Sequence, residues 1–304
     1  MYFEVSGVQV SPAIPFLVAF VASFLSSMGG LSGAFLLLPF QVSVLGFTSP
    51  AVSPTNLVYN IVAIPSGVYR YIKEGRMAWM LTGIIIAGTI PGVFMGAILR
   101  IKYLPDPKRF KFFVGCVLLY IGFRLVHNLI QGKNEKSIKN TDDRLNQAYK
   151  KGIRTVTFSL AKSTYRFLDE DYAFNTMGLF LLTFVVGIVG GVYGIGGGAI
   201  IAPFLVTFYR LPVYTIAGAA LLGTLVTSIA GVFFYTIIAP YYADTGLAVS
   251  PDWMLGILLG AGGFVGMYCG ARLQKFMPER LIKVILASLI LFISIRYILI
   301  IFKF

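Results

Sequence analysis

Glycine-rich segments interrupt two of the long apolar stretches of this chain, near residue 30 and near residue 196. A helix that begins directly after such a segment leaves its first backbone N–H groups without helical partners, and these groups carry partial positive charge. Because glycine has no Cβ, a small ligand can approach this backbone closely. The pattern predicts a binding site for a small oxyanion, with close helix packing as the alternative for either segment alone. The candidate residues are Gly29, Gly30, Ser32, Gly33, Gly194, Gly196, Gly197 and Gly198.

Polar side chains in the apolar stretches that follow add weaker candidates for hydrogen bonds to the anion. Asn56 and Asn60 are spaced i, i+4 and therefore share one face of a helix. Since an amide in lipid is costly without a partner, we expect both side chains to face the protein interior. Two roles stay open for them, namely contact with the substrate and hydrogen bonding between helices. The second half of the chain offers Thr224 and Ser228 at a similar depth.

The composition indicates what kind of fold must hold these residues. Hydrophobic residues make up 57% of the 304 residues, and charged residues only 12%. A soluble domain carries about 25% charged residues. Apolar stretches of about 20 residues recur along the chain, which predicts a multi-pass protein of the cell (plasma or inner) membrane. The net charge of +13 does not indicate nucleic acid as a partner, because many of the Lys and Arg residues lie in short loops between apolar stretches.

An internal repeat relates the two halves of the chain. The matched pairs include Trp79 with Trp253, Gly88 with Gly262, Gly92 with Gly266, and Gly96 with Gly270. The repeat predicts two transmembrane units, residues 1–131 and 174–304, in which these glycine stripes let helices pack closely. Residues 132–173 differ, since they hold nine Lys/Arg and six Asp/Glu. We expect a basic cytoplasmic segment there, either a linker or an amphipathic helix at the interface over residues 144–168.

The distribution of positive charge decides between two ways of threading the chain through the membrane. If the glycine-broken segments cross fully, Lys and Arg are shared almost equally between the two sides. If those segments are re-entrant, 17 Lys/Arg residues in loops share one side and five in loops face the other. The second arrangement predicts an all-α membrane protein of two inverted repeats. Each repeat then consists of a glycine-broken, re-entrant helix pair and three transmembrane helices.

Catalytic chemistry finds little support in the expected spans. None contains an Asp or Glu, and His127, the single histidine, lies near the end of a span. Cys116 and Cys269 do not correspond between the repeats and form no metal-binding pair. We therefore expect a protein that is not an enzyme, with no cofactor, no metal and no proton relay through a buried carboxylate.

The combined pattern resembles the sulfite exporter TauE/SafE family of membrane transporters. Three groups of residues carry this resemblance: Gly29–Gly33 with Pro39, Gly194–Gly198 with Pro203, and the segment Pro54–Asn60. The resemblance implies a duplicated carrier for small anions, including sulfite and organosulfonates, and favours export. The two glycine segments differ, because Ser32 in the first aligns with Gly196 in the second, so a fully symmetric site is not expected. An anion channel is the alternative function, followed by a membrane scaffold or signalling protein.

Overall fold

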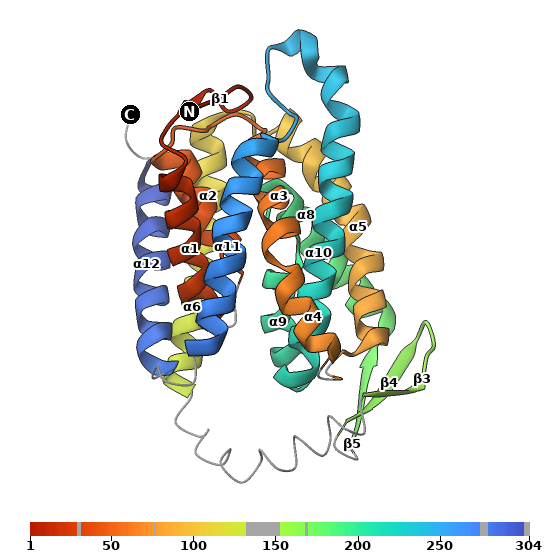
Figure 1. Cartoon of the computed structure of the whole chain (residues 1–304). Coiled ribbons are helices and arrows are strands. Elements are labelled where there is room, and N and C mark those ends of the chain that lie inside the picture. The colour runs from red at the N-terminus through yellow and green to blue at the C-terminus, as the bar shows by residue number, and fades with distance from the viewer. Residues whose placement is uncertain are drawn as a thin grey trace.

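Long apolar helices make up most of the structure, in agreement with the composition (Figure 1). The computed structural model describes residues 1–28, 32–73, 75, 77–131, 153–167, 170–273 and 279–300. Five helices in this part of the chain are long and apolar enough to cross a membrane, which makes the chain a multi-pass membrane protein. They span Trp79–Lys102, Pro107–His127, Thr176–Tyr193, Thr215–Thr245 and Trp253–Gly270.

The first half contains a helix pair interrupted by the first glycine segment, followed by four further helices. Pro65 divides the apolar stretch after the first helix pair into two short helices, because proline lacks the N–H that would continue the helix and is favoured at a first helical position. The helices are α1 (Ala13–Met28), α2 (Ala34–Ser43), α3 (Val52–Ala63), α4 (Pro65–Lys73), α5 (Trp79–Lys102) and α6 (Pro107–Gln131).

The second half follows the same order without the proline division. One continuous helix, α10, stands where the first half has both α3 and α4. The elements are α8 (Thr176–Tyr193), α9 (Gly198–Thr207), α10 (Val213–Ile238), the 3-10 helix η2 (Ala239–Thr245), α11 (Trp253–Leu273) and α12 (Glu279–Leu299).

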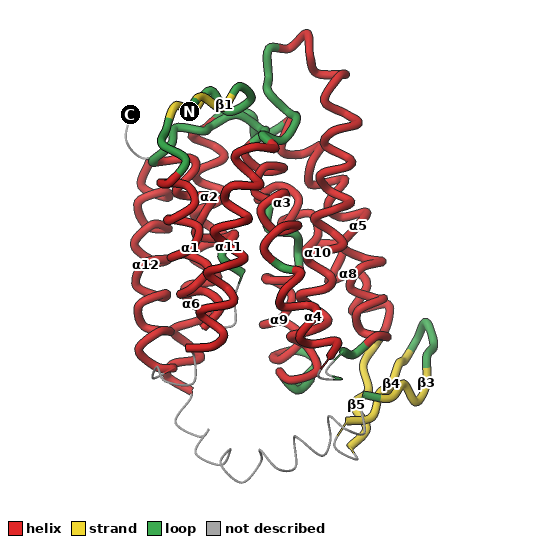
Figure 2. Tube along the Cα trace, viewed as in Figure 1, coloured by secondary structure: helices red, strands yellow, loops and turns green. Residues whose placement is uncertain are grey.

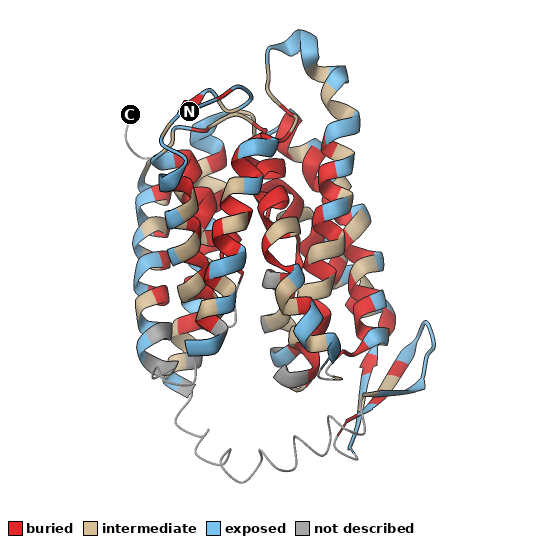
Figure 3. Ribbon diagram, viewed as in Figure 1, coloured by how far each residue is buried: buried red, intermediate tan, exposed pale blue. Residues whose placement is uncertain are grey.

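Helices from opposite halves form the main packing contacts. α5 packs along α8, α11 packs along α1, and α6 packs along α12. The glycine stripes lie in the first two contacts, as expected: a Cβ at Gly92 would lie 2.9 Å from the Gly187 Cα of α8, and one at Gly266 would lie 3.0 Å from the Phe20 Cα of α1. The buried residues face these contacts, while the outward sides of the helices are exposed (Figure 3).

Each end of the helix bundle carries a small antiparallel sheet (Figure 2). At one end, β1 (Tyr2–Phe3) pairs with β2 (Val8–Gln9), and Ser6 between them donates hydrogen bonds to the Asp252 carboxylate before α11. At the same end the Ala51 N–H before α3 donates to the Ala248 carbonyl. At the other end, β4 (Lys162–Phe167) lies between β3 (Arg154–Thr157) and β5 (Glu170–Asn175), and β5 leads directly into α8.

The structure is mostly helical, as expected, but these short strands were not predicted, and they correct the amphipathic helix that was one of two alternatives for residues 144–168. Residues 144–152 and 168 lie outside the described part, and residues 154–167 form β3, β4 and the turn between them. In β4 the buried residues Ser163, Tyr165 and Phe167 alternate with Lys162 and Arg166, which are exposed. This period of two is the pattern of a half-buried strand, and it competes with the helical spacing of the apolar residues in the same segment.

Candidate functional site

The second glycine segment forms a tight turn between two helices. α8 ends at Tyr193, and α9 begins at Gly198. Gly194 has φ of +85° and Gly196 has φ of +71°, a left-handed conformation that residues with a Cβ rarely adopt. A Cβ at Gly194 would also lie 2.9 Å from the Ser53 Cα. The turn therefore depends on glycine for its backbone conformation and for its close approach to α3.

The first glycine segment interrupts the helix pair at the corresponding place, but the helix after it begins differently. α1 ends at Met28 and α2 begins at Ala34, while Gly29 and Gly30 lie outside the described residues. Gly33 has an ordinary right-handed φ of −64°, and the Ser32 hydroxyl accepts a hydrogen bond from the Ala34 N–H at 3.3 Å. A serine side chain thus satisfies a first-turn N–H of α2, where the second half has Gly196. The two halves are unequal here, as the sequence predicts.

Asn56 connects the two interruptions. Its Nδ2 donates hydrogen bonds to the Ala34 carbonyl at 3.0 Å and to the Gly194 carbonyl at 3.0 Å. Its Oδ1 accepts a hydrogen bond from Gln41 Nε2 at 3.2 Å. The side chain is fully buried, as expected for an amide in an apolar stretch. One residue of α3 therefore holds the start of α2 and the turn after α8 together.

Asn60, one turn further along α3, makes a second connection. Its Nδ2 donates to the Ile195 carbonyl at 3.1 Å and to Ser228 Oγ at 3.3 Å, and its Oδ1 accepts from Ser32 Oγ at 3.3 Å. Together, Asn56 and Asn60 form what we call the amide bridge. Because both bridge amides bond to backbone beside helix starts, they lie where the dipoles of α2 and α9 present partial positive charge.

The remaining predicted residues of the second half lie around the turn between α8 and α9, beside the amide bridge. A Cβ at Gly196 would lie 2.7 Å from Ser228 Oγ, and a Cβ at Gly198 would collide with the Ala220 carbonyl oxygen and Thr224 Oγ1. Thr224 Oγ1 donates to the Ala220 carbonyl of its own helix at 2.8 Å. Gly197 lies against Thr89 of α5, with 3.0 Å from an added Cβ to the Thr89 methyl carbon. Every predicted site residue in the described part of the chain therefore lies near the two interruptions.

Some residues of this cluster are not among the sequence candidates. Gln41 is fully buried in α2, and its Oε1 has no hydrogen-bond partner. The Tyr193 hydroxyl at the end of α8 donates to the Phe35 carbonyl of α2 at 2.9 Å. Gln41 could have been found from the sequence, because it is a lone glutamine in the apolar stretch after Pro39. No local pattern predicts the Tyr193 bond, because it joins residues 158 positions apart.

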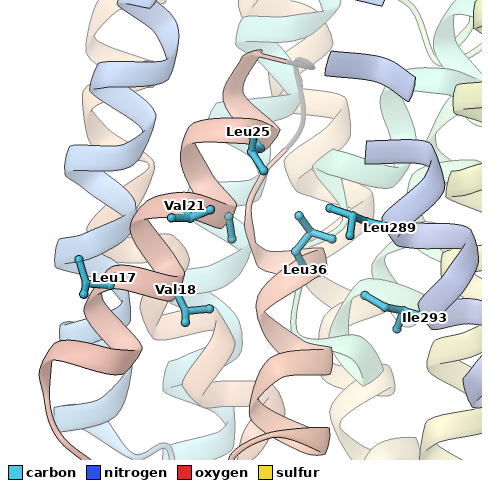
Figure 4. A pocket seen from close by; sticks show the side chains of 8 residues that line it. Leu17, Val18, Val21, Leu25, Leu36, Leu289 and Ile293 are labelled. Carbon is cyan, nitrogen blue, oxygen red and sulfur yellow. The ribbon is translucent and has the colours of Figure 1, made fainter. Parts of the chain in front are cut away.

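Other chemistry has little basis in the described residues. They contain no group of three or more His, Cys, Asp or Glu that could hold a metal ion. A separate hollow of about 390 Å³ lies between α1, α2 and α12 (Figure 4). Its lining is apolar, so it offers no partner for an anion. The lining residues are Leu17, Val18, Val21, Ala22, Leu25, Leu36, Leu289 and Ile293.

Comparison with known proteins identifies similar sequences. The family model described as "Sulfite exporter TauE/SafE" matches residues 15–297. The probable membrane transporter protein YunE of Bacillus subtilis (strain 168) is 22% identical over 285 residues, which cover 91% of this chain and 94% of that protein. The probable membrane transporter protein YdhB of the same organism is 29% identical over 116 residues, which cover 38% of this chain and 43% of that protein. No solved structure matches the chain.

Proposed function

Since this chain belongs to the sulfite exporter TauE/SafE family, we propose that it moves a small anion outward across the cell membrane. The substrate class is sulfite, an organosulfonate, or a related sulfur oxyanion or carboxylate. The observation that carries this proposal is the amide bridge, in which Asn56 and Asn60 join the two glycine interruptions. It places four amide hydrogens beside two helix starts, an arrangement suited to an oxyanion.

We further propose that the two halves are inverted and that each helix pair, α1–α2 and α8–α9, is re-entrant. Contacts at the two ends of the bundle support this. The ribbon before α1 bonds to Asp252, and the segment after α2 bonds to Ala248, so the first pair enters and leaves beside the start of α11. For the second pair, a Cβ at Gly178 in the first turn of α8 would lie 3.1 Å from the hydroxyl of Tyr209, which follows α9.

The same contacts suggest how access could alternate. α1 packs on α11 and α8 packs on α5, so each helix pair is attached to a helix of the other half. The proposed movement is a rocking of these groups around the amide bridge, as in transporters built from inverted repeats. An arriving anion would compete with the Gly194 and Ile195 carbonyls for the amide hydrogens of the bridge. In the structure three bonds from the bridge amides are directed at carbonyl oxygens and one at Ser228 Oγ.

The energy for export need not come from a coupled proton. A monovalent anion leaving an inside-negative cell gains about 2.3 kcal/mol per 100 mV of membrane potential. Facilitated export could therefore run on the potential alone. An anion channel with the same site is the rival function, and it would show single-channel currents or flux that does not saturate with substrate. A membrane scaffold or signalling protein would show no flux.

The direct test is flux in vesicles that contain the purified protein. Labelled sulfite, sulfate, thiosulfate, sulfoacetate and short carboxylates are compared with and without an imposed voltage. We expect saturable flux of at least one sulfur oxyanion or carboxylate, with a rate that follows the voltage. Absence of flux for every anion, in vesicles whose protein is folded, would contradict the proposal.

Glycine variants connect this flux to the proposed site. Gly33→Leu and Gly197→Leu should abolish flux: a Cβ at Gly33 would lie 2.5 Å from the Tyr59 hydroxyl, and Gly197 has φ of +55°. Gly83→Leu is the matched control, because nothing lies within 4 Å of a Cβ at that position. Size-exclusion profiles separate loss of folding from loss of flux. Wild-type flux in both site variants would favour the scaffold function, or a transport path elsewhere.

A further inference from the structure

The turn between β3 and β4 exposes large apolar side chains beside the start of a membrane helix. Phe158 is 64% exposed and Leu160 is 73% exposed, and both lie in this turn. Met177, in the first turn of α8, is also exposed. Isolated apolar residues on a surface are common, but this group lies at one level of the molecule next to a candidate membrane span. We call Phe158–Ala161 the apolar turn.

Hydrogen bonds fix the apolar turn at the level of the first residue of α8. The Ser159 carbonyl accepts from Thr176 Oγ1 at 2.7 Å and from Ser163 Oγ at 3.3 Å. The Ala161 carbonyl accepts from the Thr176 N–H at 3.4 Å. Since Thr176 begins α8, which is long and apolar enough to cross a membrane, the apolar turn lies where that helix enters the membrane.

Buried side chains of β4 and β5 hold the sheet against the helices. The Tyr165 hydroxyl pairs with Thr215 Oγ1 of α10 at 2.7 Å, and burial raises the pKa of Tyr165, so this hydroxyl stays neutral. Phe174 of β5 packs edge-on against Tyr209, with 6.3 Å between the ring centroids. These contacts orient the sheet relative to the bundle, and Figure 1 shows the β3–β4 connection beside the end of the bundle where α8 begins.

One exposed basic side chain borders the apolar turn: Lys162 begins β4 directly after it. Arg154, also exposed, lies at the other end of β3. Arg166, opposite Arg154 in the sheet, forms an ion pair with Asp171 at 2.7 Å and holds the pKa of that carboxyl below its usual value. Exposed apolar residues next to a cation, here Lys162, are a composition that favours an interface with anionic lipid headgroups.

We propose that the apolar turn is an interfacial anchor for the membrane that α8 enters. Phe158 and Leu160 lie among the headgroups and upper acyl chains, and Lys162 binds the phosphate of anionic lipids. The anchor would fix the start of α8, and with it the α8–α9 helix pair, relative to the membrane surface. This inference depends on the membrane placement of α8 and is independent of whether the protein transports an anion.

Tryptophan fluorescence tests the position of the turn. Trp79→Phe and Trp253→Phe remove the two native tryptophans, and Phe158→Trp then reports on the turn. The protein is placed in vesicles of phosphatidylcholine and phosphatidylglycerol that contain lipids brominated near the headgroup. We expect at least twofold quenching by the brominated lipid and protection from aqueous acrylamide. Glu170→Trp is the matched control, because this exposed residue at the far end of β5 lies about 17 Å along the strand from α8.

Each other outcome overturns a defined part of the proposal. If the tryptophan at position 158 is as accessible to acrylamide as the one at position 170, the turn is in water. If it is protected from acrylamide but not quenched by brominated lipid, protein covers the turn. For the headgroup contact, Lys162→Gln should reduce quenching in vesicles with phosphatidylglycerol at least twofold and leave it unchanged in pure phosphatidylcholine. If this variant and its parent are quenched equally in both kinds of vesicle, Lys162 does not bind lipid phosphate.

Discussion

Replacing Asn60 by leucine tests the amide bridge, because leucine has a similar volume and no hydrogen-bonding group. The substitution removes the bonds from Nδ2 to the Ile195 carbonyl and to Ser228 Oγ, and the bond that Oδ1 accepts from Ser32 Oγ. Ser32 Oγ keeps its bond from the Ala34 N–H. The main loss is therefore the donor to Ile195, at 3.1 Å the shortest of the three bonds.

Two different magnitudes follow for folding and for binding. A buried carbonyl that loses its donor costs about 1–3 kcal/mol, and polar bonds between membrane helices lie toward the lower end of that range. We therefore expect the free energy of unfolding to fall by about 1–2 kcal/mol. A hydrogen bond to a charged ligand contributes about 1.5–3 kcal/mol, so an anion that uses this amide should bind about 10- to 150-fold more weakly.

Calorimetric titration with sulfite and saturation of vesicle flux measure the affinity for the anion, and thermal unfolding in detergent measures the stability. Thr82→Val is the matched control, because Thr82 is buried and its Oγ1 bonds to the Ala78 carbonyl of its own helix at 3.0 Å. That carbonyl also accepts the Thr82 N–H, so the control should keep both stability and affinity. An Asn60→Leu protein that binds sulfite with wild-type affinity would refute the assignment of this amide to the substrate, and its role would be structural.

Three further substitutions test the packing of the helices and the role of a buried arginine at the end of α5. Gly92→Leu should prevent α5 from packing on α8 and reduce the yield of monodisperse protein at least several-fold, in contrast to Gly83→Leu. Gly198→Ala should separate α9 from α10 and cost about 1–3 kcal/mol, measured by thermal unfolding; unchanged stability would mean that the backbone of α9 can shift. Arg100→Met should cost about 2–4 kcal/mol, because Arg100 is fully buried and donates to the Thr48, Ser49 and Leu104 carbonyls. A gain in stability would instead show that desolvation of this guanidinium outweighs its bonds.

The sequence predicts the positions of the helix interruptions well. The first was expected near residue 30, and α1 ends at Met28 while α2 begins at Ala34. Glycine clusters in long apolar stretches are a strong local pattern, because a helix of about 33 residues would exceed the thickness of the membrane. The i, i+4 spacing of Asn56 and Asn60 likewise predicts their burial. Their contact with an anion stays a prediction.

Features that depend on distant partners were not predicted. The burial of Arg100 was not predicted: this residue lies in the last turn of α5, fully buried, with its guanidinium 3.7 Å from the centre of the Phe110 ring. Its bonds to the Thr48 and Ser49 carbonyls join positions about 50 residues apart, for which no local pattern exists. The strand character of β4 was missed because its alternation covers only six residues.

The packing of α1 on α11 has a consequence for synthesis of the protein. α1 has its main helical neighbour, α11, more than 220 residues later in the chain. During translation α1 must therefore remain in the lipid, or beside the insertion machinery, until α11 has been synthesised. The surface of α1 that later packs on α11 is formed by the backbone of Phe16, Phe20 and Phe24, which lies against the glycine stripe. Because α1 contains no charged residue, lipid can cover this surface until α11 is present. Nascent chains that stop before residue 253 should leave α1 open to cross-linking with lipid or with the insertion machinery.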